Sequence, residues 1–350
     1  MIAAPELDLS YSLTDGAIAA NNLESARRHA WLRFWRDPLR PGVAESIVEQ
    51  EQLTQQFLGD LAALDRLGSL IHELDRGDPE SPRTALIHAQ VASMAHRFTD
   101  ARSYLANVEG SRDLSLARDR LLLSVDQACG TNLKFLLEVR LRLAKESGRL
   151  EDLAPLGALL ADLCEFDDAD RVYQQALERY RLTSPFPVAW VCFLRGTLWG
   201  ELVPVTQHDR AAFWYRRAIE ILPGYVKARV HLAEICLQQG RLKDAEALLI
   251  PALSCGDPEV NWRLADVLAA MGKEREAEVQ MQAARIGFET LLDKHLLAFA
   301  DHGAEFYSGS GNDAQKALKL ASINLANRQT LRASELVNKT AAEAGRITTK

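Results

Sequence analysis

Two stretches of the chain, LAEICLQQGRLKDAEALLIPAL (residues 232–253) and LADVLAAMGKEREAEVQMQAAR (residues 264–285), align with each other without a gap. Equivalent residues are 32 positions apart, so that Gly240 falls on Gly272, and an alanine follows each glycine five residues later. Apolar residues recur at helical spacing on both sides of the glycine. The alignment therefore predicts a repeated unit of two helices joined by a turn, with small residues where the helices meet.

The same layout of alanines and large side chains recurs upstream, in residues 88–108, 156–177 and 210–223. Two more stretches, residues 45–75 and 116–146, carry apolar residues at helical spacing and fill the gaps between these copies. The repeat therefore extends over nearly the whole chain, although several copies are degenerate.

This unit resembles the tetratricopeptide repeat, a helix–turn–helix of about 34 residues. Pro38 and Pro223 lie where a proline commonly ends a unit in that family. The resemblance implies a stand-alone, bacterial-type repeat protein with an all-α fold. We expect a right-handed α-solenoid of about nine helix pairs, closed by a polar capping helix at residues 329–345.

We expect one solenoid over residues 1–350, without a separate catalytic domain. Its expected parts are degenerate N-terminal repeats at 7–110, middle repeats at 112–223 with a loop extension near 200–208, and C-terminal repeats at 225–327. Once these units are assigned, little sequence remains for another domain.

The charge and cysteine content narrow the function further. With 41 basic and 48 acidic residues, the net charge is −7, so nucleic acid is an unfavourable partner. Five widely spaced cysteines without a CxxC pair are typical of reduced thiols. No signal-peptide pattern or membrane-spanning run is evident, so we expect a cytoplasmic protein that does not bind membranes.

The glycine-rich stretch FYSGSGNDAQKALKLA (residues 306–321) could be a phosphate-binding loop or a turn between helices. A phosphate-binding loop follows a buried strand, and the residues before this one have helical spacing instead. We therefore expect a turn, with Asp313 as the N-cap of the helix that follows.

Two other patterns could hold a metal ion. His295, His302 and Glu305 share a helix face, but residues seven apart lie about 10 Å apart along a helix axis. The acidic run EFDDAD at residues 165–170 lacks the glycine and distal glutamate of a calcium loop. We expect neither a metal nor another cofactor, and we expect no enzyme activity.

The resemblance also implies a concave groove lined by the first helix of each pair. The groove positions predicted to bind a partner are Arg195, Trp199, Lys227, Glu234, Gln238, Glu259, Trp262 and Asp266. Tryptophan with charged neighbours is typical of interface anchors. The alternative is that Trp199 and Trp262 pack against neighbouring helices, because tryptophan is usually mostly buried.

The stretch ARRHAWLRFWRDPLR (residues 26–40) predicts a second interface at Arg28, Trp31 and Trp35. So many aromatic side chains can hardly all be buried in one helix pair, so some are expected to form a homodimer contact or a partner patch. Stacking with single-stranded nucleic acid is the rival interpretation.

These observations favour a non-catalytic scaffold or adaptor that binds a protein or peptide in the groove. One alternative is an accessory subunit that recruits a peptide substrate to a partner enzyme. Another is an enzyme with a metal or small-molecule site built within the groove.

Overall fold

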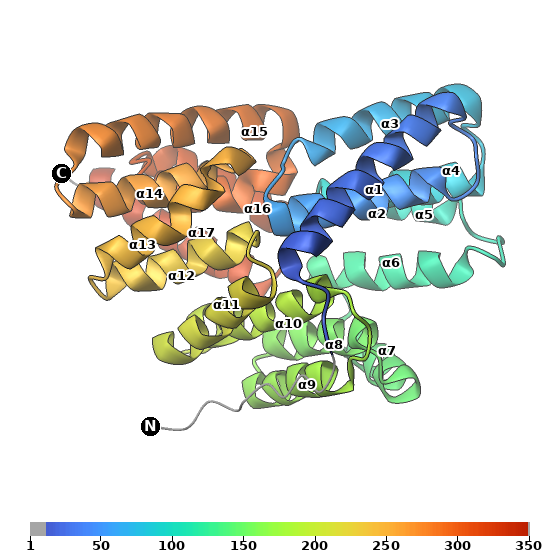
Figure 1. Ribbon diagram of the computed structural model, residues 1–350, viewed down its shortest axis with the longest axis horizontal. Coiled ribbons are helices and arrows are strands. Elements are labelled where there is room, and N and C mark those ends of the chain that lie inside the picture. Colours follow the sequence, from blue (N-terminus) through green and yellow to red (C-terminus); the bar gives the residue numbers. More distant parts are fainter. Residues whose placement is uncertain (1–11, 349–350) are drawn as a thin grey trace. The chain divides into compact units, whose positions relative to one another are not determined.

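The computed structural model describes residues 12–348, and seventeen α-helices lie within them (Figure 1). No β-strand occurs in that range, and most successive helices are joined by short turns. The predicted fold class, an all-α solenoid of helix pairs, is confirmed. None of the helices in residues 12–348 is long and apolar enough to cross a lipid bilayer.

The helices fall into two compact units, which are described one at a time. Unit 1 comprises residues 12–24, 56–59 and 133–255. The α-helices wholly within it are α7 (Leu133–Ser147), α8 (Leu150–Asp162), α9 (Phe166–Arg179), α10 (Pro185–Thr197), α11 (His208–Ile221), α12 (Val226–Gln238) and α13 (Leu242–Leu249).

Unit 2 comprises residues 25–55, 60–132 and 256–348. Its own helices are α3 (Ala63–Gly77), α4 (Pro82–Met94), α5 (Phe98–Ala106), α6 (Ser115–Ala128), α14 (Pro258–Ala270), α15 (Glu274–Ser308), α16 (Ala314–Asn327) and α17 (Leu331–Thr348). The first two helices, α1 (Gly16–Arg36) and α2 (Val43–Leu58), have residues in both units.

The aligned repeats contain the turn that their sequences predict. Gly240 follows α12 with a φ of 72°, and Gly272 follows α14 with a φ of 74°. Glycine adopts this left-handed conformation without the steric cost that a Cβ atom brings. Each glycine thus lets the chain reverse into the second helix of its pair.

Small residues allow the two helices of a pair to approach closely. Ala245 in α13 is fully buried, as the repeat pattern predicts. In the pair α8–α9, a Cβ atom added to Gly157 would lie 2.5 Å from the ring of Tyr173. In the pair α10–α11, one added to Gly196 would lie 2.4 Å from the ring of Tyr215. The same kind of glycine–tyrosine contact therefore holds the two helices together within each of these two successive pairs.

The stretch at residues 306–321 forms the predicted turn. Helix α15 ends at Ser308 and α16 begins at Ala314. The side chain of Asp313 accepts a hydrogen bond of 3.0 Å from the backbone N–H of Lys316, which confirms the N-cap.

Helix α15 consists of two helices joined at a kink. His295 has a φ of −137° and a ψ of 49°, which interrupts the helical backbone. Residues 274–294 therefore form the second helix of one pair, and residues 296–308 form the first helix of the next.

Unit 2 joins two stretches that are far apart in the sequence. Lys294 Nζ and His295 Nε2 lie 2.7 Å and 3.0 Å from the carboxylate of Asp65 on α3. Asn327 Nδ2 donates a hydrogen bond of 2.9 Å to the backbone carbonyl of His96. In an open solenoid each repeat contacts only its neighbours. This junction between residues 60–132 and 256–348 departs from that rule.

Candidate functional site

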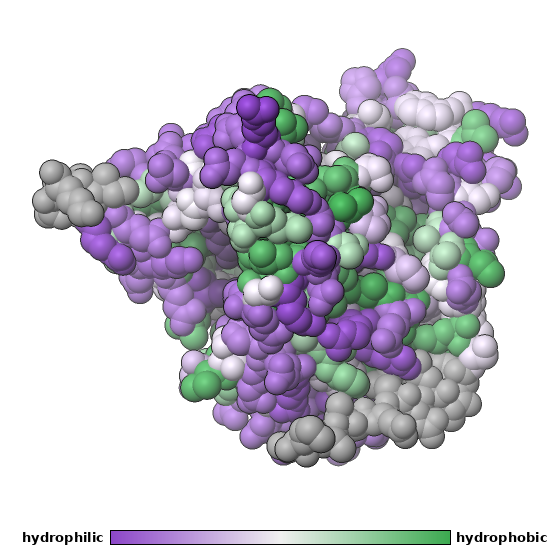
Figure 2. All heavy atoms as spheres, turned by 60° about the vertical axis from the view of Figure 1, so that its left-hand side comes forward, coloured by the Kyte–Doolittle hydropathy of each residue, from purple (hydrophilic) through white to green (hydrophobic). Residues whose placement is uncertain are grey.

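Exposed apolar side chains alone do not identify a site on this protein. On the face shown in Figure 2, hydrophobic groups are interspersed with hydrophilic ones. Single exposed apolar residues are normal on protein surfaces. A better candidate combines a hollow with an organised set of polar contacts, and unit 1 contains such a combination.

A pocket of about 620 Å³ lies in unit 1, between the start of α9 and the loop after the π-helix Leu198–Leu202. Its volume is in the range of ligand-binding pockets. The lining residues are Cys164, Glu165, Phe166, Asp167, Asp168, Arg171, Trp199, Val203, Pro204, Val205 and Gln207. We call this the loop pocket.

One wall of the loop pocket is acidic. Glu165 precedes α9, and Asp167 and Asp168 lie in its first turn, where carboxylates interact favourably with the helix dipole. Arg171 forms an ion pair with Asp168. The remaining acids give this wall a net negative charge.

A second wall of the loop pocket is apolar and comes from the loop after the π-helix. Val203 is buried, whereas Val205 is 79% exposed at the mouth of the pocket. Pro204 lies between them and has no backbone N–H to satisfy. This wall therefore offers apolar surface next to the carboxylates.

Buried polar contacts fix the position of Trp199 in the loop pocket. Asp170 on α9 accepts hydrogen bonds of 2.7 Å and 2.8 Å from Arg195 Nε and Nη2. It also accepts one of 3.1 Å from Trp199 Nε1 and one of 2.9 Å from Arg210 Nη2. The guanidinium of Arg210 stacks on the Trp199 ring, 3.4 Å from its centroid. The tryptophan is thus held both by its edge and by one face.

The electrostatics of Asp170 agree with this geometry. Burial by itself would raise the pKa of its carboxyl group. The hydrogen bonds and charge of Arg195, the N–H of Trp199 and the charge of Arg210 outweigh burial and lower the pKa overall. Asp170 therefore remains a carboxylate in the folded protein.

The π-helix gives the backbone around Trp199 its unusual path. The backbone N–H of Gln207 donates a hydrogen bond of 2.8 Å to the carbonyl of Trp199, which anchors the loop onto the helix. The backbone N–H of Val203 donates a hydrogen bond of 3.2 Å to the carbonyl of Leu198, five residues earlier, which is the spacing of a π-helical turn. Such π-helical turns often occur at functional sites.

The structure places the groove residues predicted in unit 1 in different environments. Arg195 and Trp199 are 2% and 4% exposed, which agrees with the alternative that Trp199 packs against neighbouring helices. On α12, Lys227 and Glu234 are partly buried and Gln238 is exposed. These three remain accessible to a partner, and their role in binding stays a prediction.

The predicted groove residues in unit 2 are also mostly covered. Trp262 and Glu259 are 4% and 7% exposed, so the tryptophan is again a packing residue. Asp266 is partly buried and accepts a hydrogen bond of 2.7 Å from Ser310 Oγ. The same hydroxyl accepts one of 3.0 Å from Trp262 Nε1. These side chains support each other, and a partner role for them stays a prediction.

The predicted second interface has one well-exposed aromatic residue. Trp35 is 55% exposed, Trp31 is partly buried and Arg28 is exposed. Among the residues that the structure describes, no group of three or more His, Cys, Asp or Glu side chains is arranged to hold a metal ion.

Sequence reasoning missed the loop pocket, although a signal for it exists. The acidic run at residues 165–170 is considered there only as a calcium loop, and the segment near residues 200–208 only as a loop extension. Insertions in repeat proteins often gather on the binding face. A longer loop beside acidic residues could therefore have indicated the site.

Comparison with solved structures finds several similar chains. The chain is similar to BtubC from P. vanneervenii, with 17% identity, a TM-score of 0.42 and coverage of 65% of this chain and 90% of that one. It is similar to a tetratricopeptide repeat protein from Parabacteroides merdae, with 16% identity, a TM-score of 0.42 and coverage of 79% and 98%. It is also similar to the C-terminal part of a tetratricopeptide repeat-containing protein from Cytophaga hutchinsonii. The identity is 12%, the TM-score is 0.35, and the match covers 84% of this chain and 98% of that one.

No curated protein matches the sequence. Residues 206–255, which contain α11 to α13, match the tetratricopeptide repeat family. Helix pairs with a glycine turn also occur outside the matched segment, as at α14, Gly272 and α15. Residues 206–255 therefore carry a tetratricopeptide repeat, and the rest of the described chain is built of helix pairs of the same kind.

Proposed function

We propose that this protein is a non-catalytic scaffold whose loop pocket binds a cationic segment of a partner protein. The observation that carries the proposal is the pocket of about 620 Å³ that has an acidic wall, an apolar wall and a fixed tryptophan. Tetratricopeptide repeats serve as surfaces for protein–protein interaction, which supports a protein as the ligand.

The chemistry of the two walls selects the occupant. A lysine or arginine side chain carries a charged head on an apolar stem. The head would lie against Glu165 and Asp167, and the stem and its apolar neighbours would lie against Pro204 and Val205. The preferred ligand is therefore a segment with a basic residue beside apolar ones. An acidic segment would be repelled.

The lining of the pocket supports binding rather than catalysis. Its one thiol is Cys164, and the lining contains no histidine that could act as its general base. A role as the recruiting subunit of a partner enzyme is compatible with the same pocket, since that role also requires only binding.

The groove positions on α12 are a secondary part of the proposal. Gln238 is exposed and Lys227 is partly exposed, so a bound segment that continues beyond the pocket could contact them. The buried Trp199 acts through the shape of the pocket rather than as an exposed anchor.

The experiment is affinity capture from an extract of the native host with the wild type and with the double variant Asp167→Lys/Val205→Ser. Both residues are exposed, so the variant should fold. We expect a protein that binds the wild type and is lost from the variant, and cross-linking should map its contact to a basic, apolar segment.

The matched control is Asp119→Lys/Val279→Ser, which makes the same changes at exposed positions outside the pocket. The control should keep the partner. If the pocket variant retains every protein that the wild type captures, the loop pocket is not the binding site.

A further inference from the structure

The exposed face of α1 forms a rigid aromatic and cationic surface in unit 2. We define the α1 platform as Arg28, Trp31, Leu32, Trp35 and Arg36. At 3.6 residues per turn these side chains lie on one side of the helix. Leu32 and Trp35 are 57% and 55% exposed, and arginines lie at both ends.

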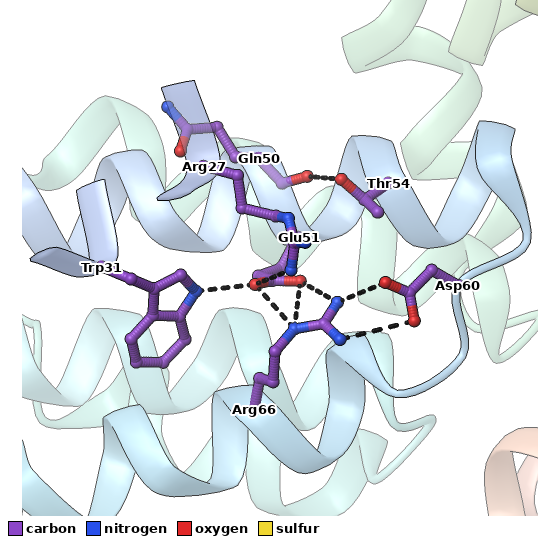
Figure 3. Close-up of polar contacts among 7 residues, drawn as sticks. All are labelled: Arg27, Trp31, Gln50, Glu51, Thr54, Asp60 and Arg66. Atoms are coloured by element: carbon purple, nitrogen blue, oxygen red, sulfur yellow. Dashed lines mark hydrogen bonds and ion pairs between the residues drawn. The ribbon is translucent and has the colours of Figure 1, made fainter. Parts of the chain in front are cut away.

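A network of polar contacts beneath the platform holds its aromatic part in place (Figure 3). Trp31 Nε1 donates a hydrogen bond of 2.7 Å to Glu51 on α2, which is fully buried. Arg66 donates to both carboxylate oxygens of Glu51, at 2.9 Å and 3.0 Å from its Nε. Arg27 Nη1 lies 3.3 Å from the same carboxylate, and Asp60 binds the outer side of Arg66.

The fixed Trp31 in turn supports the exposed Trp35. The two indole rings are stacked, with centroids 5.7 Å apart and an angle of 25° between their planes. The buried ring of Phe34 meets Trp35 edge-on at 5.3 Å. Trp35 is thus exposed but held on two sides, and an aromatic ring that is ordered before binding loses little entropy on binding.

The charge around the platform defines the partner. Residues 27–40 contain five arginines and one aspartate, although the whole chain has a net charge of −7. Arg28 and Arg36 are eight residues apart, or about 12 Å along the helix. A partner with acidic residues at a similar spacing and apolar residues between them would match both the charges and the rings.

We infer that the α1 platform binds an acidic, amphipathic helix of a partner protein. A straight row of side chains along one helix is the shape into which a second helix packs, with its ridges in the grooves of the first. The inference does not depend on the loop pocket, which lies in unit 1 and has the opposite charge.

Other occupants fit the platform less well. In a two-fold dimer through this face, Arg28 of one copy would meet Arg36 of the other, and like charges repel. Binding at a membrane surface requires a long apolar helix face. The platform instead offers Leu32 and Trp35 beside the partly buried Trp31.

The test is selection from a phage-displayed library of single helices, with one face randomised, on the immobilised full-length protein. The selected clones are then assayed against Trp35→Ala and Arg36→Glu. We expect clones with acidic residues flanking apolar ones at helical spacing, whose affinity falls about tenfold or more with either variant and declines with added salt.

The controls are Phe135→Ala and Arg275→Glu, which change an equally exposed aromatic residue on α7 and an exposed arginine on α15. Both should bind the selected clones like the wild type. Clones that are basic, or that bind Trp35→Ala unchanged, would overturn the inference.

Two further probes distinguish the rival occupants. Binding of a 20-nucleotide oligo(dT) strand or of phosphatidylglycerol vesicles that is lost in Trp35→Ala would assign the platform to nucleic acid or to lipid instead. Sedimentation of the wild type as a dimer that Trp35→Ala converts to a monomer would assign it to a second copy.

Discussion

At the level of single residues, buried charge fixes the side chains that shape both surfaces. Asp170 holds Trp199 in unit 1, and Glu51 holds Trp31 in unit 2. In each case a carboxylate bonds both an arginine and an indole N–H. A buried charge is tolerated only when it is paired and hydrogen-bonded, so such a cluster has few alternative arrangements.

The substitution Asp170→Asn should destabilise the protein strongly. It leaves Arg195, which is 2% exposed, without a charged partner. Breaking a buried pair in this way costs about 3–5 kcal/mol of unfolding free energy. The change would be measured by urea unfolding. Asp168→Asn, which breaks a more exposed pair with Arg171, is the control and should cost about 1 kcal/mol or less.

The contribution of Asp170 should also depend on pH. Its pKa is lowered in the folded state, so its stabilisation is complete above the unfolded value of about 3.9 and is lost as the pH falls through the folded value. The stability difference between the wild type and Asp170→Asn should therefore shrink as the pH falls from about 5 to about 2. A difference that stays constant with pH would show that Asp170 is not stabilised as a charge.

Sequence reasoning succeeds at this scale only where the partners of a residue are local. The N-cap of Asp313 was predictable because its partner Lys316 is three residues away. Asp170 and Arg195 belong to different helix pairs, and nothing in their spacing indicates that they meet. The hydrogen bond from Trp199 to Asp170 could not be derived for the same reason.

At the level of helices, the repeat is held together by close contacts between a small residue and a large one. Gly157 faces Tyr173 and Gly196 faces Tyr215, and the buried Ala233 on α12 occupies the position of Gly157 in a later pair. The 32-residue alignment predicted the helices, the turns and the small residues, because local spacing encodes all three. It did not predict the kink at His295, where two helices of successive pairs are joined.

The substitution Gly196→Ala tests this packing. Alanine normally stabilises a helix by about 0.5–1 kcal/mol relative to glycine. At Gly196 the new methyl group would collide with the ring of Tyr215, so the variant should be less stable than the wild type. Gly68→Ala on α3, where the methyl group meets no atom within 4 Å, should be more stable. Thermal unfolding of both variants would show whether Gly196→Ala lowers the melting temperature while Gly68→Ala raises it.

At the level of the whole chain, the junction in unit 2 distinguishes this protein from an open row of repeats. Leu64 on α3 lies in one buried cluster with Phe288 and Phe299 of α15. These residues are more than 200 positions apart, and no periodicity relates them. The repeat pattern alone predicts contacts between neighbours only, so the junction could not be foreseen.

The substitution Leu64→Ala should weaken both sides of the junction. Removing a buried leucine costs about 2–5 kcal/mol, depending on how far the surrounding structure relaxes. Hydrogen exchange should become faster in α3 and in α15 together. Leu116→Ala, at a residue that is 64% exposed on α6, is the control. Faster exchange confined to residues 60–132 would show that the two stretches are not coupled.

The measurement that tests the proposed function most directly is site-specific photo-cross-linking at the loop pocket. A benzophenone amino acid would replace Val205 at the pocket mouth or, as a control, Val279 on α15, which is 65% exposed. In extract of the native host we predict a protein adduct at position 205 that is absent at position 279, and the linked peptide should contain a basic residue beside apolar ones. An acidic linked peptide, or the same adducts at both positions, would contradict the proposed function.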